Sequence, residues 1–315
     1  MSQYIDFHAL YTVGKRWFLF VNTTAAPITF FYDVPFGRFA TPNSIFALDG
    51  IKSWIIMELV SPVSFLTTLL AHPVSPEFPV PFVNGNGFTP QAFLVGVFLL
   101  HYLNRAIISP LRTPSRSPSH PIVIAAAASF NSLNGFLMAT YLSSATAADF
   151  LSDAFQTPRF WIGVALWAIG FIGNIAHDEI LLNIRRKAKA KGKASDKKQG
   201  EHYAIPTGGL FAYVSFPNYF FEWIEWAGFA LAAAPPPDLS TLPSKDALAT
   251  VFKNGGAGLQ SLFRPFADSV SPPWAFLSSE IGAMLPRAVR GHKWYHTRFG
   301  RAYPPERKIV IPFIL

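Results

Sequence analysis

Long uncharged stretches recur along the chain, separated by short polar segments. Seven of them approach the roughly 20 consecutive apolar residues that a helix needs to cross a bilayer. None shows the alternation of a membrane β-strand, and the sequence has no internal repeat. The pattern predicts an all-α integral membrane protein, a bundle of about seven transmembrane helices in a single domain over 1–315. The predicted spans lie near residues 9–32, 51–71, 91–109, 120–143, 159–183, 210–234 and 272–289.

The first and last of these stretches are the weakest. Lys15 and Arg16 lie inside the first, and Glu280 and Pro286 interrupt the last. A charged side chain at bilayer depth is costly unless it finds a partner or extends to the headgroups. We therefore expect Lys15 and Arg16 to extend toward the headgroups. The prediction of a transmembrane helix bundle rests mainly on the five middle stretches.

Composition supports a membrane protein and excludes several kinds of site. Of 315 residues, 50% are hydrophobic and only 14% are charged, whereas a soluble domain has about 25% charged residues. The chain has no cysteine, which excludes disulfides, thiolate catalysis and Cys-ligated metal sites. It also has no HExxH, GxGxxG, GxSxG or Walker motif, so we expect no metal site. The net charge of +8 does not indicate nucleic acid, because much of it lies in one loop beside membrane-type sequence.

The connecting segments predict an orientation. Residues 184–201 carry eight Lys or Arg against two acids, whereas residues 72–90 carry no basic residue. Basic loops face the cytosol in most membrane proteins, so we expect the basic loops and the C-terminus on that side. Residues 235–271, rich in Pro, Gly and Ser, are expected to be a lumenal insertion with little fixed structure. No cleavable signal peptide is evident at the start, where Asp6 and His8 replace a basic region.

Ionisable side chains also occur inside the predicted spans. Glu58 lies in the second, Tyr102 in the third, and Glu222 and Glu225 in the sixth. A buried carboxylate costs several kcal/mol unless it is paired, so each of these acids either serves a site or ties helices together. The fifth span ends in the polar segment 174–187, which either flanks the membrane or holds an anionic ligand. These alternatives stay open on the residues alone.

Four ordered motifs carry a resemblance. From Glu58 to its C-terminus the chain is similar to the steroid 5α-reductase family. The motifs are LLHYLNR at 99–105, GNIAHDEILLNIR at 173–185, IPTGGLFAYVSFPNYFFEWIEW at 205–226 and HKWYHTRFGRAYPPERKIVIPFIL at 292–315. PFGRF at 35–39 resembles a further short motif that follows the first span in this family.

The resemblance implies a seven-helix enzyme of the endoplasmic reticulum membrane. Such enzymes use NADPH to reduce a carbon–carbon double bond conjugated to a carbonyl. Addition of hydride to the β-carbon moves negative charge onto the carbonyl oxygen, which a hydrogen-bond donor in a dry site can stabilise. By resemblance, Tyr102 is that donor and Glu58 orients it or shares its proton.

The resemblance also assigns candidate cofactor ligands. It places the polar end of the fifth span against NADPH, where Asn and Asp suit ribose and amide groups and Arg suits phosphate. Arg186 and the lysines of 187–198 are interpreted as loop charge. The cofactor candidates are Arg105, Arg116, Asn174, Asp178, Arg185, Tyr203, Asn218, Arg287, His292 and Tyr295.

Three positions depart from the family pattern and leave the substrate open. Met57 stands where steroid-reducing relatives often have Gln, Ala204 where a basic residue is common, and Gly291 where a His often occurs. The expected substrate is a 3-oxo-Δ4-steroid or a sterol intermediate, and the alternative is a trans-2-enoyl-CoA or a polyprenol. A membrane methyltransferase would give Glu58 and Tyr102 no obvious role. A non-catalytic scaffold or transporter would not need so many matching polar positions.

Overall fold

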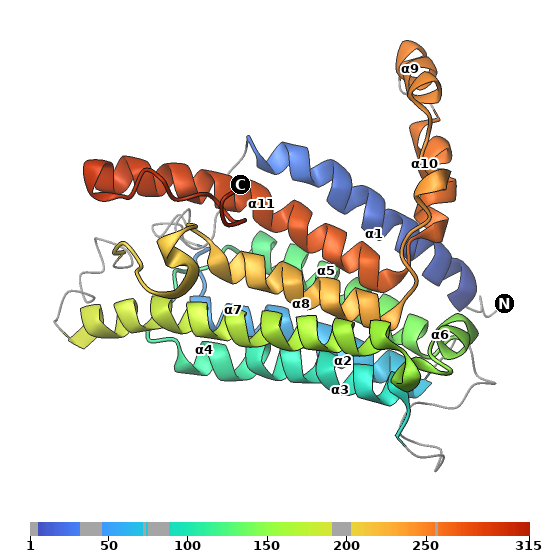
Figure 1. Cartoon of the computed structure of the whole chain (residues 1–315), viewed down its shortest axis with the longest axis horizontal. Helices are drawn as coiled ribbons and strands as arrows, with labels where there is room; N and C mark the ends of the chain where they lie inside the picture. Colours follow the sequence, from blue (N-terminus) through green and yellow to red (C-terminus); the bar gives the residue numbers. More distant parts are fainter. Residues whose placement is uncertain (1–5, 32–45, 72–73, 75–87, 191–202, 256–257) are drawn as a thin grey trace.

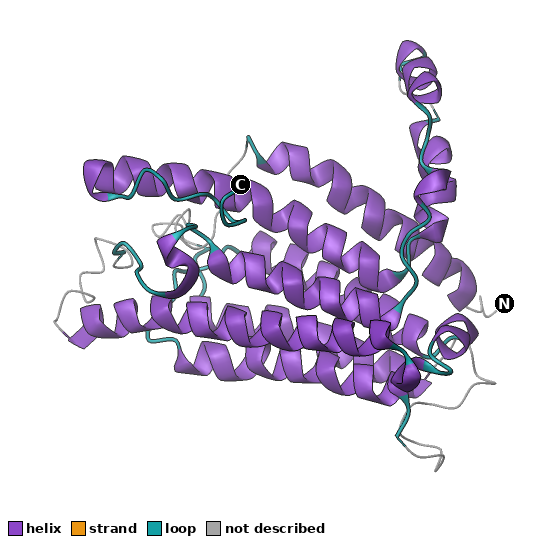
Figure 2. Cartoon of the chain, in the orientation of Figure 1, coloured by secondary structure: helices purple, strands orange, loops and turns teal. Residues whose placement is uncertain are grey.

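The computed structural model describes residues 6–31, 46–71, 74, 88–190, 203–255 and 258–315. Its long helices run side by side along one axis (Figure 1). Among the described residues there is no strand, and two isolated bridges join Leu48 to Ser119 and Val214 to Lys308 (Figure 2). The prediction of an all-α bundle is confirmed. The long helices are α1 (Phe7–Thr29), α2 (Gly50–Ala71), α3 (Pro90–Tyr102), α5 (Pro121–Leu142), α7 (Pro158–Ala190), α8 (Pro217–Ala233) and α11 (Pro272–Phe299).

Shorter helical elements connect or extend these helices. After Tyr102 the chain passes without a break from α3 into a π-helical turn, η2, and then into α4. The short elements are η2 (Leu103–Ile108), α4 (Ser109–Arg112), α6 (Ala145–Phe150), η3 (Ala154–Gln156), η4 (Gly209–Ala212), η5 (Leu239–Thr241), α9 (Lys245–Lys253), α10 (Leu259–Ser269) and η6 (Gly300–Ala302).

Four helical stretches of the described residues are long and apolar enough to cross a membrane. They are Gly50–Ala71, Pro90–Arg112, Pro121–Leu142 and Pro158–Ala190. On α2, the residues Ile56, Val63 and Leu70 are 57%, 56% and 65% exposed, and their seven-residue spacing places them on one face. Such a face is suited to contact with lipid.

The three remaining predicted spans correspond to α1, α8 and α11. α8 has only 17 residues, and the other two carry charged side chains, so a total of seven spans remains a prediction. The PFGRF motif at 35–39 and most of the basic loop, residues 191–201, lie outside the described residues.

Close packing of α7 against α8 brings two polar helix ends together. A Cβ atom at Gly170 would lie 2.3 Å from the Glu225 backbone nitrogen, and one at Gly228 would lie 2.4 Å from that of Trp167. Glycine at these positions therefore lets the two backbones touch, as small residues do between membrane helices. The contact places Asn174 of α7 opposite Asn218 of α8.

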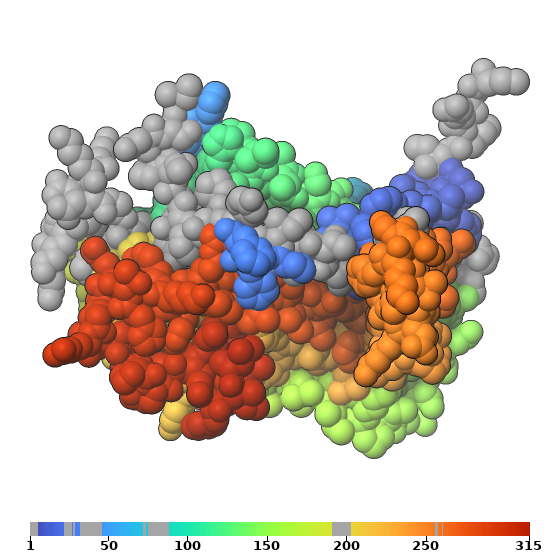
Figure 3. All heavy atoms as spheres, turned by 90° about the horizontal axis from the view of Figure 1, so that it is seen from above, coloured from blue at the N-terminus to red at the C-terminus, as the bar shows by residue number. Residues whose placement is uncertain are grey.

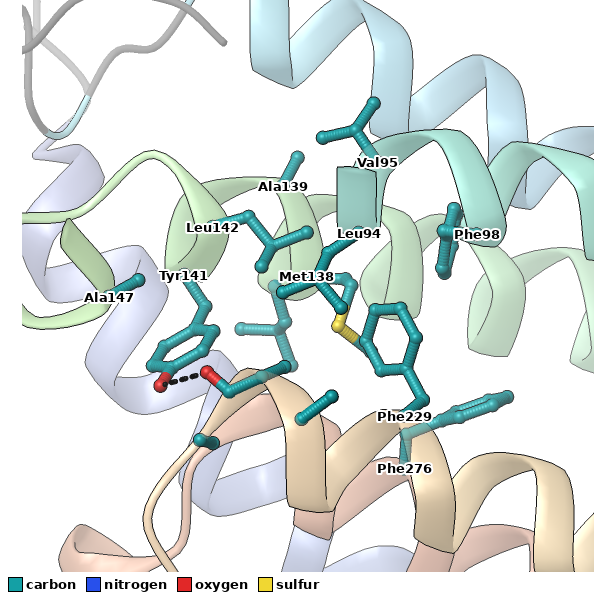
Figure 4. Packing of buried hydrophobic residues seen from close by; sticks show 14 of the residues in the cluster. Leu94, Val95, Phe98, Met138, Ala139, Tyr141, Leu142, Ala147, Phe229 and Phe276 are labelled. Carbon is teal, nitrogen blue, oxygen red and sulfur yellow. Dashed lines mark hydrogen bonds between the residues drawn. The ribbon is translucent and has the colours of Figure 1, made fainter. Parts of the chain in front are cut away.

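A large apolar core fills the interior of the bundle next to these polar residues. Phe65 and Phe98 stack with their ring centroids 4.3 Å apart, and Phe98 also contacts Tyr102. Figure 4 shows Phe98, Phe229 and Phe276 in the same core. There the Tyr141 hydroxyl donates a hydrogen bond of 3.1 Å to the Ala233 carbonyl. A buried phenol with a satisfied hydroxyl stabilises the helix contact without leaving a polar atom unpaired.

The expectation of little fixed structure in residues 235–271 is wrong, because the segment contains α9 and α10. The charges inside the first predicted span are also placed differently from expectation. Arg16 makes two hydrogen bonds to the Asp268 carboxylate, of 2.6 and 2.9 Å. Lys15 donates to the Asp268 carbonyl at 2.9 Å. A partner within the protein therefore replaces the expected extension toward the headgroups.

Candidate active site

Tyr102 lies where three helices meet. Its side chain is 3% exposed, and its hydroxyl accepts a hydrogen bond of 3.2 Å from Asn134 Nδ2. Ser61 also contacts this hydroxyl, and Asn134 Nδ2 lies 3.3 Å from Ser61 Oγ. α2, α3 and α5 therefore hold the phenol in one orientation. The sequence analysis missed Ser61 and Asn134, although an Asn inside an apolar span is a signal for a buried polar contact.

The π-helical turn after Tyr102 places Arg105 in the same region. Its guanidinium lies 3.4 Å from the Glu58 carboxylate and 3.5 Å from that of Glu222. Trp54 Nε1 donates to the Arg105 carbonyl at 3.2 Å, and the guanidinium lies over the Trp54 ring. A π turn is wider than an α turn, so it changes the direction in which Arg105 points relative to Tyr102.

The two predicted catalytic residues lie close to each other but are held by different partners. Glu58 is within electrostatic range of Tyr102, and its described partner is Arg105. Glu280 of α11 also interacts electrostatically with Tyr102 and Glu58. The region around the phenol is therefore rich in carboxylates that share one guanidinium.

Residues in the middle of α7 and at the start of α8 form a continuous chain of hydrogen bonds. Asn174 Nδ2 donates to the Asn218 carbonyl at 3.0 Å and to Glu222 Oε2 at 3.2 Å. Asn218 Nδ2 donates in turn to Asp178 Oδ1 at 3.0 Å. Asn218 Oδ1 is buried, and no residue that the structure describes donates a hydrogen bond to it. Glu222, which the sequence analysis treated only as a charged residue within a span, joins these residues to Arg105.

Several arginine side chains lie beside this chain of hydrogen bonds. The guanidinium of Arg116 lies 3.4 Å from the centroid of the Trp54 ring, a cation–π contact. Loss of water lowers the pKa of Arg116 to about 9, and repulsion from Arg105 and Arg185 adds to the shift. The attraction of Glu58 and Asp178 is smaller. This edge of the site therefore favours binding of an anion.

A second ionic group holds the segment that contains Arg116. Arg112 donates to Glu179 Oε2 at 2.9 Å, and Arg186 pairs with the other oxygen of the same carboxylate. Arg186 also donates to the Arg112 carbonyl at 3.1 Å, and Lys189 donates to the Pro114 carbonyl at 3.4 Å. Arg186 and Lys189 were expected to be loop charge, but they fasten α7 to residues 112–114.

The C-terminal motif forms a separate polar group. Ser215 Oγ lies 2.6 Å from His292 Nδ1 and 2.6 Å from the Tyr303 hydroxyl. His296 Nε2 lies 3.2 Å from His292 Nε2. Burial, followed by repulsion from His296, lowers the pKa of His292 to about 4. His292 therefore stays neutral near pH 7.

The remaining candidates surround this second group. Tyr295 stacks on Tyr303 with ring centroids 5.1 Å apart, and Tyr203 contacts Trp294 edge-on at 5.0 Å. Arg287 is partly buried on the same helix, α11. The structure thus divides the sequence candidates into two groups. Tyr102, Glu58, Arg105, Arg116, Asn174, Asp178, Arg185 and Asn218 are linked by contacts or electrostatic interactions, and Tyr203, His292 and Tyr295 lie at the C-terminal motif.

Comparison with known proteins identifies the family. The model of the family described as 3-oxo-5-alpha-steroid 4-dehydrogenase matches residues 118–237 and 265–315. The chain belongs to this steroid 5-alpha-reductase family. A 3-oxo-5-alpha-steroid 4-dehydrogenase 1 of Bos taurus is 32% identical over 89% of this chain and 88% of its own length. A steroid 5-alpha-reductase of Solanum lycopersicum is 33% identical over 90% of this chain and 89% of its own length.

A third relative shows that the similarity extends over nearly all of the chain. An uncharacterized protein of Schizosaccharomyces pombe is 35% identical over 92% of this chain and 94% of its own. Membership in the steroid 5-alpha-reductase family supports an oxidoreductase that acts on a CH–CH group and reduces a steroid enone. It also agrees with the four apolar helices in indicating a membrane-embedded protein.

Proposed function

We propose that the protein uses NADPH to reduce a carbon–carbon double bond conjugated to a carbonyl in a hydrophobic lipid, most simply a 3-oxo-Δ4-steroid or a sterol intermediate. The observation that carries the proposal is the buried Tyr102 hydroxyl, held by Asn134 and placed beside the Glu58–Arg105 pair. Tyr102 is only 3% exposed, and such a buried site suits a hydrophobic substrate better than a water-soluble one.

The chemistry assigned to Tyr102 follows from its surroundings. The hydroxyl accepts a hydrogen bond from Asn134 Nδ2, so its own proton can be donated to a substrate carbonyl. A donor fixed in advance at the oxygen that gains negative charge can contribute several kcal/mol to transition-state stabilisation. Arg105 orients the Glu58 carboxyl, which lies within electrostatic range of the phenol.

The residues present fit a phosphate-bearing dinucleotide. Arg116 and Arg185 supply positive charge that a phosphate would neutralise, and loss of water followed by repulsion from Arg105 and Arg185 lowers the pKa of Arg116. Asn218 Oδ1 is a buried acceptor to which no described residue donates, and it could accept from a hydroxyl or amide of a ligand. Asn174, Asp178 and Glu222 lie beside it. When bound, the reduced nicotinamide would supply the hydride.

Cofactor binding is tested with two substitutions at one end of α7. NADPH should bind more tightly than NADH, and Arg185→Ala should weaken NADPH binding far more than Lys187→Ala does. Both residues are cationic and lie two positions apart, but Lys187 is exposed. Binding is measured by titration of purified protein with each nucleotide. Equal losses in the two variants, or none, would remove Arg185 from the cofactor site.

Activity is tested with a panel of enones and purified protein, with mass spectrometry of the products. Tyr102→Phe keeps the ring and should lower kcat by roughly 10²–10³ while NADPH binding survives. Because coupled catalytic groups are not additive, Tyr102→Phe combined with Glu58→Gln should be little worse than the poorer single variant. Turnover of a trans-2-enoyl-CoA or a polyprenol, with no turnover of steroids, would establish the alternative substrate class.

Location is part of the same proposal. We place the protein in the endoplasmic reticulum membrane as a multi-pass protein, with its basic loops and C-terminus in the cytosol. Accessibility labels at residues 193 and 250 should then react from opposite sides of the membrane. Reaction of both from one side would contradict the seven-span arrangement.

A further inference from the structure

Three helical elements form an arm that takes no part in the candidate site. The α9–α10 arm consists of η5, α9 and α10, and it runs across the common axis of the long helices (Figure 1). Viewed from above, it stands as a separate orange block against α1 (Figure 3). If the long helices cross a bilayer, an element perpendicular to them runs along the membrane plane.

The sequence of the arm is amphipathic. On α10, apolar residues recur at 259, 262, 263 and 266, the spacing of one helix face. On α9, Leu248, Val251 and Phe252 share a face, and Thr250 and Asp246 lie on the opposite one. Phe266 packs against the core of the bundle, so the base of the arm is fixed.

The arm leaves large apolar side chains uncovered, both in η5 and on α9. Leu239, Leu242 and Phe252 are 68%, 45% and 66% exposed, and no residue of α9 is buried. Three such side chains in one short insertion are costly in water. They need a partner that the described part of the chain does not supply.

A group of charges marks the depth at which the arm leaves the bundle. Lys15, Arg16 and Arg264 all surround the Asp268 carboxylate or carbonyl. On α1, the apolar residues on both sides of these charges are about half exposed: Leu10 and Val13 are 46% and 47% exposed, and Trp17 and Val21 are 46% and 49% exposed. This outward apolar face, with its charges paired to Asp268, is suited to contact with lipid.

We propose that the α9–α10 arm lies in the headgroup region of the bilayer and inserts the apolar face of α9 into the adjacent leaflet. The partner of this apolar face is the lipid surface, which also contacts the adjoining apolar outer face of α1. The three cations of the arm, Lys245, Lys253 and Arg264, nearly balance Asp246 and Asp268. Insertion therefore depends on apolar burial and does not require anionic lipid.

The absence of cysteine from the chain allows a direct test. Phe252→Cys and Thr250→Cys each create a single labelling position on opposite faces of α9. Each variant is labelled with an environment-sensitive fluorophore and reconstituted in phosphatidylcholine nanodiscs. We expect a blue-shifted emission at position 252 and quenching by a nitroxide-labelled lipid several-fold stronger than at position 250. Anionic lipid should leave the contrast unchanged.

Several outcomes would overturn the proposal. Equal emission and equal quenching at the two positions would place α9 in water. Weak lipid quenching at position 252, together with energy transfer between labelled copies, would assign the face to a second copy of the chain. If the difference in quenching between positions 252 and 250 appears only with anionic lipid, α9 binds the membrane by electrostatic attraction and not by insertion of its apolar face. Because both positions are exposed, an unchanged elution volume shows that the variants fold, and the test is independent of the proposed reaction.

Discussion

His101 Nδ1 lies 2.6 Å from Glu225 Oε1, and this contact joins α3 to α8 at the residue that precedes Tyr102. The imidazole also contacts the Trp226 ring at 4.6 Å and the Tyr102 ring at 5.0 Å. Neither His101 nor Glu225 is more than 8% exposed in its side chain. Because water does not reach the pair, each group depends on the other for its polar partner.

Removal of one member should therefore destabilise the protein strongly. Glu225→Leu leaves a buried imidazole without its partner, and we expect a loss of about 1–3 kcal/mol in the free energy of unfolding. Glu225→Gln keeps an acceptor and should lose much less. Thermal unfolding in a fixed detergent measures both. A Leu variant as stable as the Gln variant would mean that the contact contributes packing alone.

The contact between α7 and α8 provides a second prediction. Gly170→Ala forces a Cβ atom against the backbone of α8, and we expect it to lower stability by roughly 1–3 kcal/mol. Gly96→Ala is the matched control, because it also changes a helical glycine and its Cβ would meet nothing within 4 Å. Thermal unfolding of the two variants is compared under the same conditions. A larger loss at Gly96 would contradict the packing argument.

The position of the Tyr102 phenol provides a third prediction. Asn134→Ala removes the amide that donates to the Tyr102 hydroxyl, so turnover should fall about ten-fold or more while NADPH binding changes little. Ser64→Ala is the control, because it removes a contact of α5 with α2 that does not involve the phenol, the 2.7 Å bond from Ser64 to the Ser132 carbonyl. Steady-state rates and nucleotide binding are measured for both variants. Equal rates in the two would exclude Asn134 from positioning the phenol.

Stability should depend on pH through His292. Its pKa is about 4 in the folded protein and about 6.5 in an unfolded chain. Between these values the unfolded chain binds a proton that the folded protein does not, so stability is greatest above about pH 6.5 and falls as the pH is lowered toward 4. His292→Gln should flatten this part of the profile of melting temperature against pH. An unchanged profile would assign the dependence to other groups.

The sequence was sufficient for the helices and for the family, but only partly for the site. Runs of apolar residues predict α2, α5 and α7 because the spacing and length of such segments depend on local composition alone. The motifs indicated Asn174 and Asp178 because they lie on one helix end. Asn134 was missed because its role depends on the rotation of α5 against α3, which no local pattern records.

The two amphipathic helices show a different limit. Residues 235–271 contain many Pro, Gly and Ser residues, which suggested an irregular segment. The helical spacing within α9 and α10 is present in the sequence, but each helix is only about three turns or shorter. α10 is held to the bundle by contacts such as Arg16 with Asp268, which join residues 252 positions apart.

The π-helical turn Leu103–Ile108 makes the site sensitive to the length of the chain as well as to its residues. Such a turn corresponds to one extra residue within an α-helix. Deletion of Leu103 would restore a regular α turn, and because Arg105 lies within the π turn, its guanidinium would point in a different direction relative to Glu58 and Glu222. We therefore expect this stretch to tolerate many substitutions on its lipid face but neither an insertion nor a deletion.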